Sequence, residues 1–275
     1  MYNLLSAGIM RLLKSKLFWL LCVSALLWSA VIYFLLWDSV EYFGEIYLNV
    51  NAGFYFMMPL FYIGVAEAVF CAFFIGTDYS DGTIRNKLFT GHKRTAVYLS
   101  NFALTSFAGI CFCLAHIAAL VLVGLPLIGT GVFTAIPELP LRLLCEALIV
   151  LANSAIFTLL SMLNSNKTAA AVVGILLSFV IIVSGVMVYS ALKQPEFYSM
   201  DADGSTVVPN PRYIKDGAAR EALEWLSASV PFSASMEVIH PEGGKASARV
   251  TVCQFGLTAV LTAVGVAAFR KKDVK

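Results

Sequence analysis

Long apolar runs separated by short polar segments make up most of this sequence. Each run holds about 20 or more residues, the length that a helix needs to cross a hydrocarbon layer roughly 30 Å thick. The first run is longer than the apolar part of a typical signal peptide, so we expect it to remain as a span. The pattern predicts six membrane-spanning helices, at about residues 17–37, 53–76, 98–124, 140–163, 168–192 and 247–269.

The composition supports a membrane protein and excludes two other classes. Hydrophobic residues make up 59% of the chain and charged residues only 13%, whereas soluble domains are roughly 45–50% apolar and about 25% charged. A net charge of +2 provides no basic surface for nucleic acid, which we exclude as a partner. We therefore expect one all-α, polytopic domain over residues 1–275, surrounded by membrane lipid.

The distribution of Lys and Arg predicts the orientation. Six spans place residues 1–16, 77–97, 164–167 and 270–275 on one side of the membrane. These segments hold most of the 19 basic residues, and the positive-inside rule assigns them to the cytoplasm. We therefore expect a protein of the cell membrane with both termini cytoplasmic. The basic residues in these segments are Arg11, Lys14, Lys16, Arg85, Lys87, Lys93, Arg94, Lys167, Arg270, Lys271, Lys272 and Lys275.

The first 16 residues have the pattern of an amphipathic helix. Apolar residues recur at spacings of three and four, and Arg11, Lys14 and Lys16 follow on the opposite face or at the end. Such a helix lies in the membrane interface with its cations near anionic headgroups. The alternative is a basic flank that only fixes the topology. The recurring residues are Leu4, Leu5, Gly8, Ile9, Leu12 and Leu13.

The cytoplasmic segment 77–97 predicts a helix of two to three turns. Ser80 or Asp81 is suited to cap its start, Gly91 to end it, and Thr95 to cap the third span. Such a short helix is not stable alone and needs a surface to rest on. That surface is either a cytoplasmic partner or the protein's own helix ends. The face expected to carry the apolar contacts holds Ile84, Leu88 and Phe89.

The outer segment 193–246 is too long to be a structureless loop in a compact protein. Its sequence predicts a helix over Tyr213–Ser229, with Arg220 and Glu224 one turn apart. We expect Pro231 to end this helix.

Two polar residues lie at membrane depth and are candidates for a translocation path. Glu67 is a carboxyl near the middle of the second span, where a charge costs about 2.5–3.5 kcal/mol. It should therefore face protein or water rather than lipid. Asn153 in the fourth span lies at a similar depth, and we expect it to hydrogen-bond Glu67. The carboxyl has two interpretations: a proton-sensitive group on a substrate path, or a protonated group bonded between helices.

The sequence carries no recognisable catalytic or metal-binding motif. It lacks a P-loop, an H-E-x-x-H motif and a G-x-S-x-G motif. We therefore predict no catalytic residue, no metal site and no cofactor in this chain, which is not expected to be an enzyme. A proton-coupled secondary transporter that uses Glu67 and a non-transporting membrane scaffold or sensor remain as alternative functions.

Two segments resemble a known family. The run from Tyr79 to Leu88, followed by Gly91 and Arg94, resembles the cytoplasmic segment of bacterial ABC-2-type transporter permeases. The run from Pro209 to Tyr213, which precedes the last helices, is also similar to that family. The likeness extends over the whole chain and includes the N-terminal helix, the six spans and the large outer segment.

The resemblance implies the membrane subunit of an exporter for a peptide, drug or other amphipathic substrate. Such permeases form homodimers or heterodimers and work with a separate ATP-binding cassette subunit, which binds ATP and magnesium. The outer segment would form a re-entrant or capping structure. The coupling helix would fall on 82–88, with Ile84 and Leu88 as apolar contacts and Arg85 and Lys87 as polar ones. The implied contact residues are Asp81, Gly82, Thr83, Ile84, Arg85, Asn86, Lys87, Leu88 and Phe89.

Overall fold

The computed structural model describes residues 2–43, 45–129, 139–199, 207–239 and 244–273. Most of these residues are helical, and six of the described helices are long and apolar enough to cross a membrane. The predicted all-α polytopic fold is confirmed. The elements are α1 (Tyr2–Lys14), α2 (Lys16–Phe43), α3 (Glu45–Ser80), α4 (Thr83–Phe89), α5 (Arg94–Ala119), the π-helical turn η1 (Leu120–Gly124), α6 (Leu125–Ile128), α8 (Leu139–Leu163), α9 (Lys167–Leu192), β1 (Phe197–Ser199), β2 (Val207–Pro209), α10 (Ala218–Ser229), α11 (Pro231–Ile239) and α12 (Gly244–Lys271).

The predicted spans coincide with α2, α3, α5 with η1, α8, α9 and α12. The largest difference is in α3, which has 36 residues and extends beyond the predicted range 53–76 at both ends. Polar residues at these ends continue the helix outside the apolar run. Hydropathy therefore located the crossing but underestimated the length of the helix.

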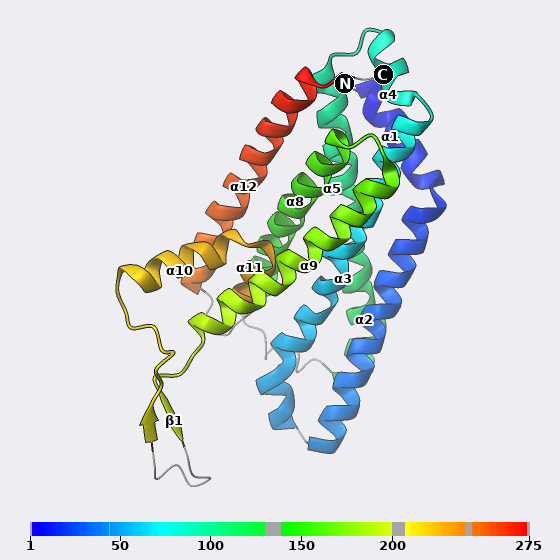
Figure 1. Cartoon of the computed structure of the whole chain (residues 1–275). Helices are drawn as coiled ribbons and strands as arrows, with labels where there is room; N and C mark the ends of the chain where they lie inside the picture. Colours follow the sequence, from blue (N-terminus) through cyan, green and yellow to red (C-terminus); the bar gives the residue numbers. More distant parts are fainter. Residues whose placement is uncertain (1, 44, 130–138, 200–206, 240–243, 274–275) are drawn as a thin grey trace.

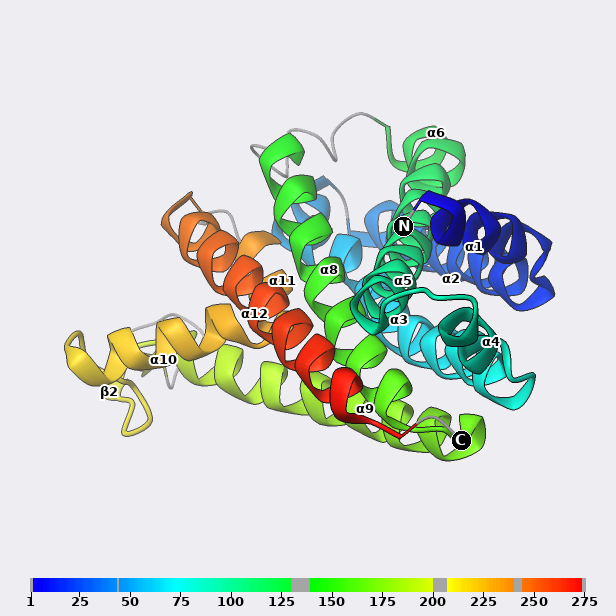
Figure 2. The same cartoon turned by 90° about the horizontal axis from the view of Figure 1, so that it is seen from above.

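The helices pack around α3, α5 and α8 (Figure 2). Helix α8 contacts α3, α5 and α12, and α3 also contacts α2 and α9. Aromatic rings fill part of the core: Phe70 lies 6.3 Å from Phe18 and 6.0 Å from Phe112, centroid to centroid, in edge-to-face arrangements. Many leucines and valines on α2 and α9 face outward, as expected for surfaces solvated by lipid tails.

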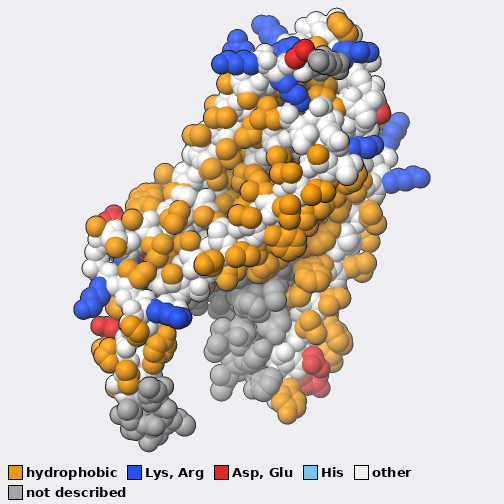
Figure 3. Space-filling model, viewed as in Figure 1, with side chains coloured by type: hydrophobic (Ala, Val, Ile, Leu, Met, Phe, Trp, Pro, Cys, Tyr) orange, Lys and Arg blue, Asp and Glu red, His pale blue; other side chains and the backbone are white. Residues whose placement is uncertain are grey.

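The two termini and α4 lie at one end of the molecule, which we call the α4 end (Figure 1). An even number of crossings requires both termini to lie on the same side. In the space-filling view, Lys and Arg side chains gather at this end, while apolar side chains cover the middle of the visible face (Figure 3). The charge pattern used to predict orientation is thus present on the folded surface.

Helix α1 is amphipathic, as predicted, and packs mainly on α5. Leu4 and Leu12 are buried, and Gly8 allows a close approach: a Cβ there would lie 2.3 Å from Cδ1 of Leu104. Ile9 and Met10 remain exposed. The helix therefore presents one apolar side to the protein and another to its surroundings, which suits a position at the membrane interface.

The outer segment differs from its prediction in two places. Helix α10 begins at Ala218 rather than at Tyr213, and Pro231 does not simply end a helix but occupies the first position of α11. Proline is favoured at this position because its missing N–H would have no intrahelical acceptor there. A short hairpin of β1 and β2 precedes these helices and pairs Phe197 with Pro209. The predicted ion pair of Arg220 with Glu224 is present at 3.5 Å.

Helix α11 packs against α3, α8, α9 and α12. Arg142 of α8 donates to the carbonyl of Val238 at 2.6 Å, and Ser235 donates to Glu146 of α8 at 3.1 Å. At Gly185 of α9, an added Cβ would lie 2.8 Å from the backbone nitrogen of Ser233. The outer segment is therefore packed into the bundle rather than attached only at its ends.

Candidate functional site

The predicted short helix is present as α4, and its ends show which sequence signals are used. Gly82, with a φ of 68°, occupies the N-cap without a side-chain hydrogen bond, and Gly91, with a φ of 86°, follows the last turn. These left-handed conformations are those that glycine adopts at little cost. Gly91 therefore ends the helix as predicted.

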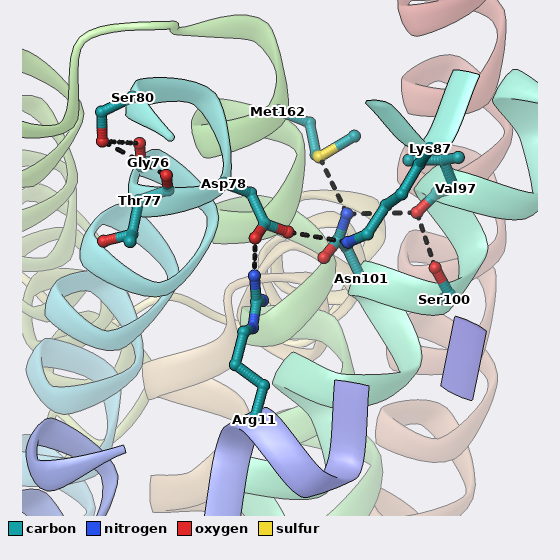
Figure 4. Close-up of polar contacts among 10 residues, drawn as sticks. All are labelled: Arg11, Gly76, Thr77, Asp78, Ser80, Lys87, Val97, Ser100, Asn101 and Met162. Atoms are coloured by element: carbon teal, nitrogen blue, oxygen red, sulfur yellow. Dashed lines mark hydrogen bonds and ion pairs between the residues drawn. The ribbon is translucent and has the colours of Figure 1, made fainter. Parts of the chain in front are cut away.

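Three predicted capping roles are wrong. The Ser80 hydroxyl donates to the carbonyls of Gly76 and Thr77, within its own helix α3 (Figure 4). Asp81 lies in the turn, and the N-cap of α4 is the next residue, Gly82. Likewise, α5 begins at Arg94 after a Lys93 N-cap with no side-chain bond, so Thr95 does not cap it. Each helix starts one or two residues away from the position that the capping pattern indicated.

Ile84 attaches α4 to the bundle. Its side chain is fully buried in the same apolar cluster as Val97 and Phe74, and Leu88 packs against that cluster. Ile84 is therefore not available for direct contact with another protein, which corrects the expectation that it forms an apolar contact with a partner. Of the two interpretations of the segment, the structure supports docking on the protein's own helix ends for this face.

The opposite face of α4 is exposed. Phe89 is 80% exposed, and Arg85 and Asn86 are also exposed. Phe89 was predicted to share a face with Ile84 and Leu88, but five residues from Ile84 correspond to a rotation of about 500°, and the ring points away from the core. An exposed aromatic next to an exposed cation is typical of the anchor residues at protein interfaces.

Asp78 joins three helices at the α4 end. Its carboxylate, 2% exposed, forms ion pairs with Arg11 of α1 and with Lys87 of α4, the latter at 2.9 Å (Figure 4). The Arg11 guanidinium also lies over the Phe74 ring, 3.7 Å from its centroid. Because Asp78 belongs to α3, the two ion pairs connect α1 and α4 to the same turn of one membrane helix.

A second cluster, next to the first, ties the end of α12 to the same region. Tyr79 donates to the carbonyl of Met162 at 2.5 Å, and the Lys272 ammonium donates to Tyr79 at 2.9 Å and to Met162 at 3.0 Å. Arg94 donates to the carbonyls of Phe269 and Lys272. The last turn of α3 is thereby tied to α8 and to the segment after α12, which Arg94 of α5 also holds.

Neither cluster was identified from the sequence. The sequence pattern places Asp78 in the segment 77–97 without a partner, and it marks Arg11 and Lys272 as basic residues that predict the orientation. One indication was available: Asp78 is an acid at the end of an apolar helix, in a region where most charges are basic. Such an acid is expected to have basic partners, but the sequence does not say which of them.

We expect the stability contributed by Lys87 to rise with pH in alkaline solution. Burial, and secondarily the charge of Arg11, lower the pKa of Lys87 from 10.5 to about 8. Between these values the unfolded chain binds more protons at this position than the folded chain, so the free energy of unfolding increases with pH and is unaffected below about pH 8. The measurement is the difference in unfolding free energy between the native chain and Lys87→Met across pH 7–10. A difference that falls with pH would show that the ion pair with Asp78 outweighs burial.

Glu67 lies in the middle of the bundle, but not with its predicted partner. Ser154, not Asn153, donates to its Oε1 at 2.5 Å, and Gly109 of α5 faces the same oxygen closely. Asn153 instead lines a small cavity of about 30 Å³ that Glu146 also lines. The expected hydrogen bond between Glu67 and Asn153 is therefore wrong, while a role for either residue in translocation stays a prediction.

Comparison with known proteins gives one family match. A family model described as ABC-2 family transporter protein matches residues 4–185, about two thirds of the chain. No curated protein matches it. The matched range includes most of α1, the whole of α4, the first four spans and most of the fifth. It also includes the residues that α1, α3, α5 and α8 contribute to the two clusters.

Proposed function

The chain belongs to the ABC-2 family of transporter proteins, and on this premise we propose that it is the permease subunit of an ATP-driven exporter for a peptide, drug or other amphipathic substrate. One observation supports a docked ATPase above others: α4 has one face fixed in the bundle and one face, with Phe89 80% exposed, that nothing in the described chain covers. A short helix held in this way is suited to receive force from a second protein.

In this proposal the α4 end is cytoplasmic and contacts a separate ATP-binding cassette subunit. ATP and magnesium bind to that subunit, and this chain carries out no chemistry. The contact face consists of Asp81 in the turn before α4 and of Arg85, Asn86 and Phe89 on the helix, while Ile84 and Leu88 attach α4 to the bundle. A second permease chain, identical or different, completes the transporter.

The packing of α4 suggests how movement of the ATPase reaches the membrane. A push on Phe89 is transmitted to the bundle, because the buried Ile84 and the ion pair of Lys87 with Asp78 attach the same short helix to it. Asp78 passes the displacement to α3, and its pairing with Arg11 passes it to α1. Small displacements of packed helices of this kind are a known basis for switching between two arrangements.

A proton-coupled secondary transporter is the second candidate, since Glu67 is a buried carboxyl with one oxygen, Oε2, that has no hydrogen-bond partner in the described structure. The other oxygen, Oε1, accepts a hydrogen bond from Ser154 and packs closely against Gly109. A carboxyl with a purely structural role would make the same contacts. The family match favours the ATP-driven exporter.

We expect the double variant Phe89→Asp, Arg85→Glu to lose its ATPase subunit. Both side chains are exposed, so the change should leave folding intact while reversing charge and removing the aromatic anchor. The tagged chain would be purified from its native membrane and co-purifying P-loop proteins quantified by mass spectrometry. We expect at least a tenfold loss relative to the native chain, as for a hot-spot residue worth 2 kcal/mol or more.

The control is Phe197→Asp, which changes an exposed aromatic on the hairpin, far from α4 (Figure 1). It should retain the ATPase. Equal recovery of the ATPase with the double variant would contradict the docking role of α4. Transport that continues after ATP depletion at a maintained proton gradient would favour the secondary transporter instead.

A further inference from the structure

A groove of about 780 Å³ lies at the α4 end, between the last turn of α1, the first residues of α2 and the neighbouring face of α3. It is lined by residues of two kinds. Met10, Leu17, Phe73 and Phe74 form apolar walls, whereas Arg11, Lys14, Ser15 and Thr77 contribute cations and hydroxyl groups. Among these residues only Arg11, through its ion pair with Asp78, takes part in the proposed coupling of α4 to the bundle.

The two kinds of residue are separated along the membrane normal on α3. Thr77 lies one helical turn, about 6 Å, nearer to the α4 end than Phe73. Phe73 is 39% exposed and Met10 is 55% exposed, so the apolar walls are open to the membrane rather than closed off by protein. The groove therefore has a polar end at the interface and an apolar end within the hydrocarbon.

The polar end has an excess of positive charge. Arg11 pairs with Asp78, but Asp78 also pairs with Lys87, and among the described residues Lys14 forms no ion pair. Two nitrogens of Arg11, Nε and Nη2, are buried and have no hydrogen-bond acceptor in the described structure, so a ligand reaches them only if the Arg11 side chain shifts. Burial lowers the pKa of Arg11 to about 10, against a raising effect of the Asp81 carboxylate, and this leaves Arg11 charged at neutral pH. The three cations Arg11, Lys14 and Lys87 thus outnumber the two carboxylates Asp78 and Asp81 in this region.

We propose that this groove binds one anionic phospholipid from the leaflet at the α4 end. Its phosphate lies between Arg11 and Lys14, with the hydroxyls of Ser15 and Thr77 within reach of the headgroup. Its acyl chains extend along Phe73 and Leu17. A free phosphate would satisfy the cations but leave the apolar walls uncovered, and a neutral lipid would cover the walls but leave the charge excess, so the combined lining favours an anionic lipid.

The bound lipid would also affect how firmly α4 is attached to α3. The Asp78 carboxylate of α3 pairs both with Arg11 of α1 and with Lys87 of α4. A phosphate beside Arg11 offsets part of the positive charge around Asp78. It thereby stabilises the arrangement in which α1, α3 and α4 are held together.

The test is native mass spectrometry of the purified full chain in a neutral detergent, with phosphatidylglycerol and phosphatidylcholine of the same acyl chains. We expect the native chain to retain phosphatidylglycerol preferentially. Each basic residue near a membrane surface contributes about a fivefold preference for anionic lipid, so Lys14→Gln should reduce the preference roughly fivefold and Arg11→Gln, Lys14→Gln roughly 25-fold. The single variant leaves the pairs of Asp78 untouched and keeps the test valid if the double variant folds poorly.

The matched control is Lys93→Gln, Lys271→Gln, which removes the same charge from exposed positions at the same end of the molecule but outside the groove. It should retain the native preference. Three results would overturn the proposal: equal retention of both lipids by the native chain, equal loss with the control variant, or displacement of the lipid by soluble glycerol phosphate at equal concentration. The last result would show that the headgroup alone is recognised. None of these outcomes depends on an ATPase subunit.

Discussion

Replacing Asp78 by Asn is expected to lower the free energy of unfolding by about 3–5 kcal/mol, the cost of removing one partner from a buried ion pair. The carboxylate is 2% exposed and faces two cations from two other helices. Asparagine has a similar shape and still accepts a hydrogen bond, but it leaves Arg11 and Lys87 without a counter-charge. We expect α1 and α4 to detach from α3 before the spans separate.

Thermal unfolding in detergent measures the loss of stability, and hydrogen exchange of residues 83–89 measures the release of α4. Asp81→Asn is the matched control, because it removes the same charge three residues later from an exposed position. It should change the unfolding free energy by less than about 0.5 kcal/mol. Similar effects of the two variants would show that Asp78 contributes only net charge, and would remove it as the link between α4 and the membrane helices.

Gly109→Leu is expected to destabilise the bundle by at least about 2 kcal/mol. A Cβ at Gly109 would lie 2.0 Å from Oε1 of Glu67 and 2.7 Å from Cγ1 of Val150, so both neighbours must move. Overpacking costs about 1–3 kcal/mol. Displacement of Glu67 also breaks its bond to Ser154, which leaves a buried polar group unsatisfied at a further cost of about 1–3 kcal/mol.

Gly256→Leu in α12 is the control, since a Cβ there meets nothing within 4 Å. A leucine facing lipid is favourable by roughly 0.3–0.6 kcal/mol, and the chain should unfold at the native temperature or slightly above. The measurement is the unfolding temperature of both variants by the loss of a monodisperse peak on heating. An unchanged unfolding temperature for Gly109→Leu would mean that α3, α5 and α8 leave room for a large side chain at this position.

The sequence was sufficient to predict the spans because the length of an apolar run has a direct physical meaning in a bilayer. It was not sufficient to predict which side of each span faces the protein. Asn153 and Ser154 are adjacent and thus about 100° apart on the helix, and the residues around them are apolar on all sides. Hydropathy therefore gives no rotational phase, and the polar partner of Glu67 could be located only to within one residue.

The sequence predicts the position of the short helix along the chain but not which of its faces packs against the bundle. The segment 81–89 contains apolar residues at Ile84, Leu88 and Phe89. Helical spacing places Phe89 about 140° from Ile84, but it does not say which of the two faces packs on the protein. The pairing at Asp78 depends on Arg11, which is more than 60 residues away, and on the close approach of α1 to α3. Contacts of this range depend on the packing of the whole bundle and are not encoded in any local pattern.

The length of α3 has a mechanical consequence. An uninterrupted helix of 36 residues measures about 54 Å, nearly twice the thickness of the hydrocarbon layer, and only the turn at Asp81 and Gly82 separates it from α4. A tilt of α3 imposed at Ser80 therefore also moves its opposite end, and Pro59 is the one proline within the helix, where an intrahelical hydrogen bond is missing. The α4 attachment and the opposite end of the bundle are thus connected through a single helix.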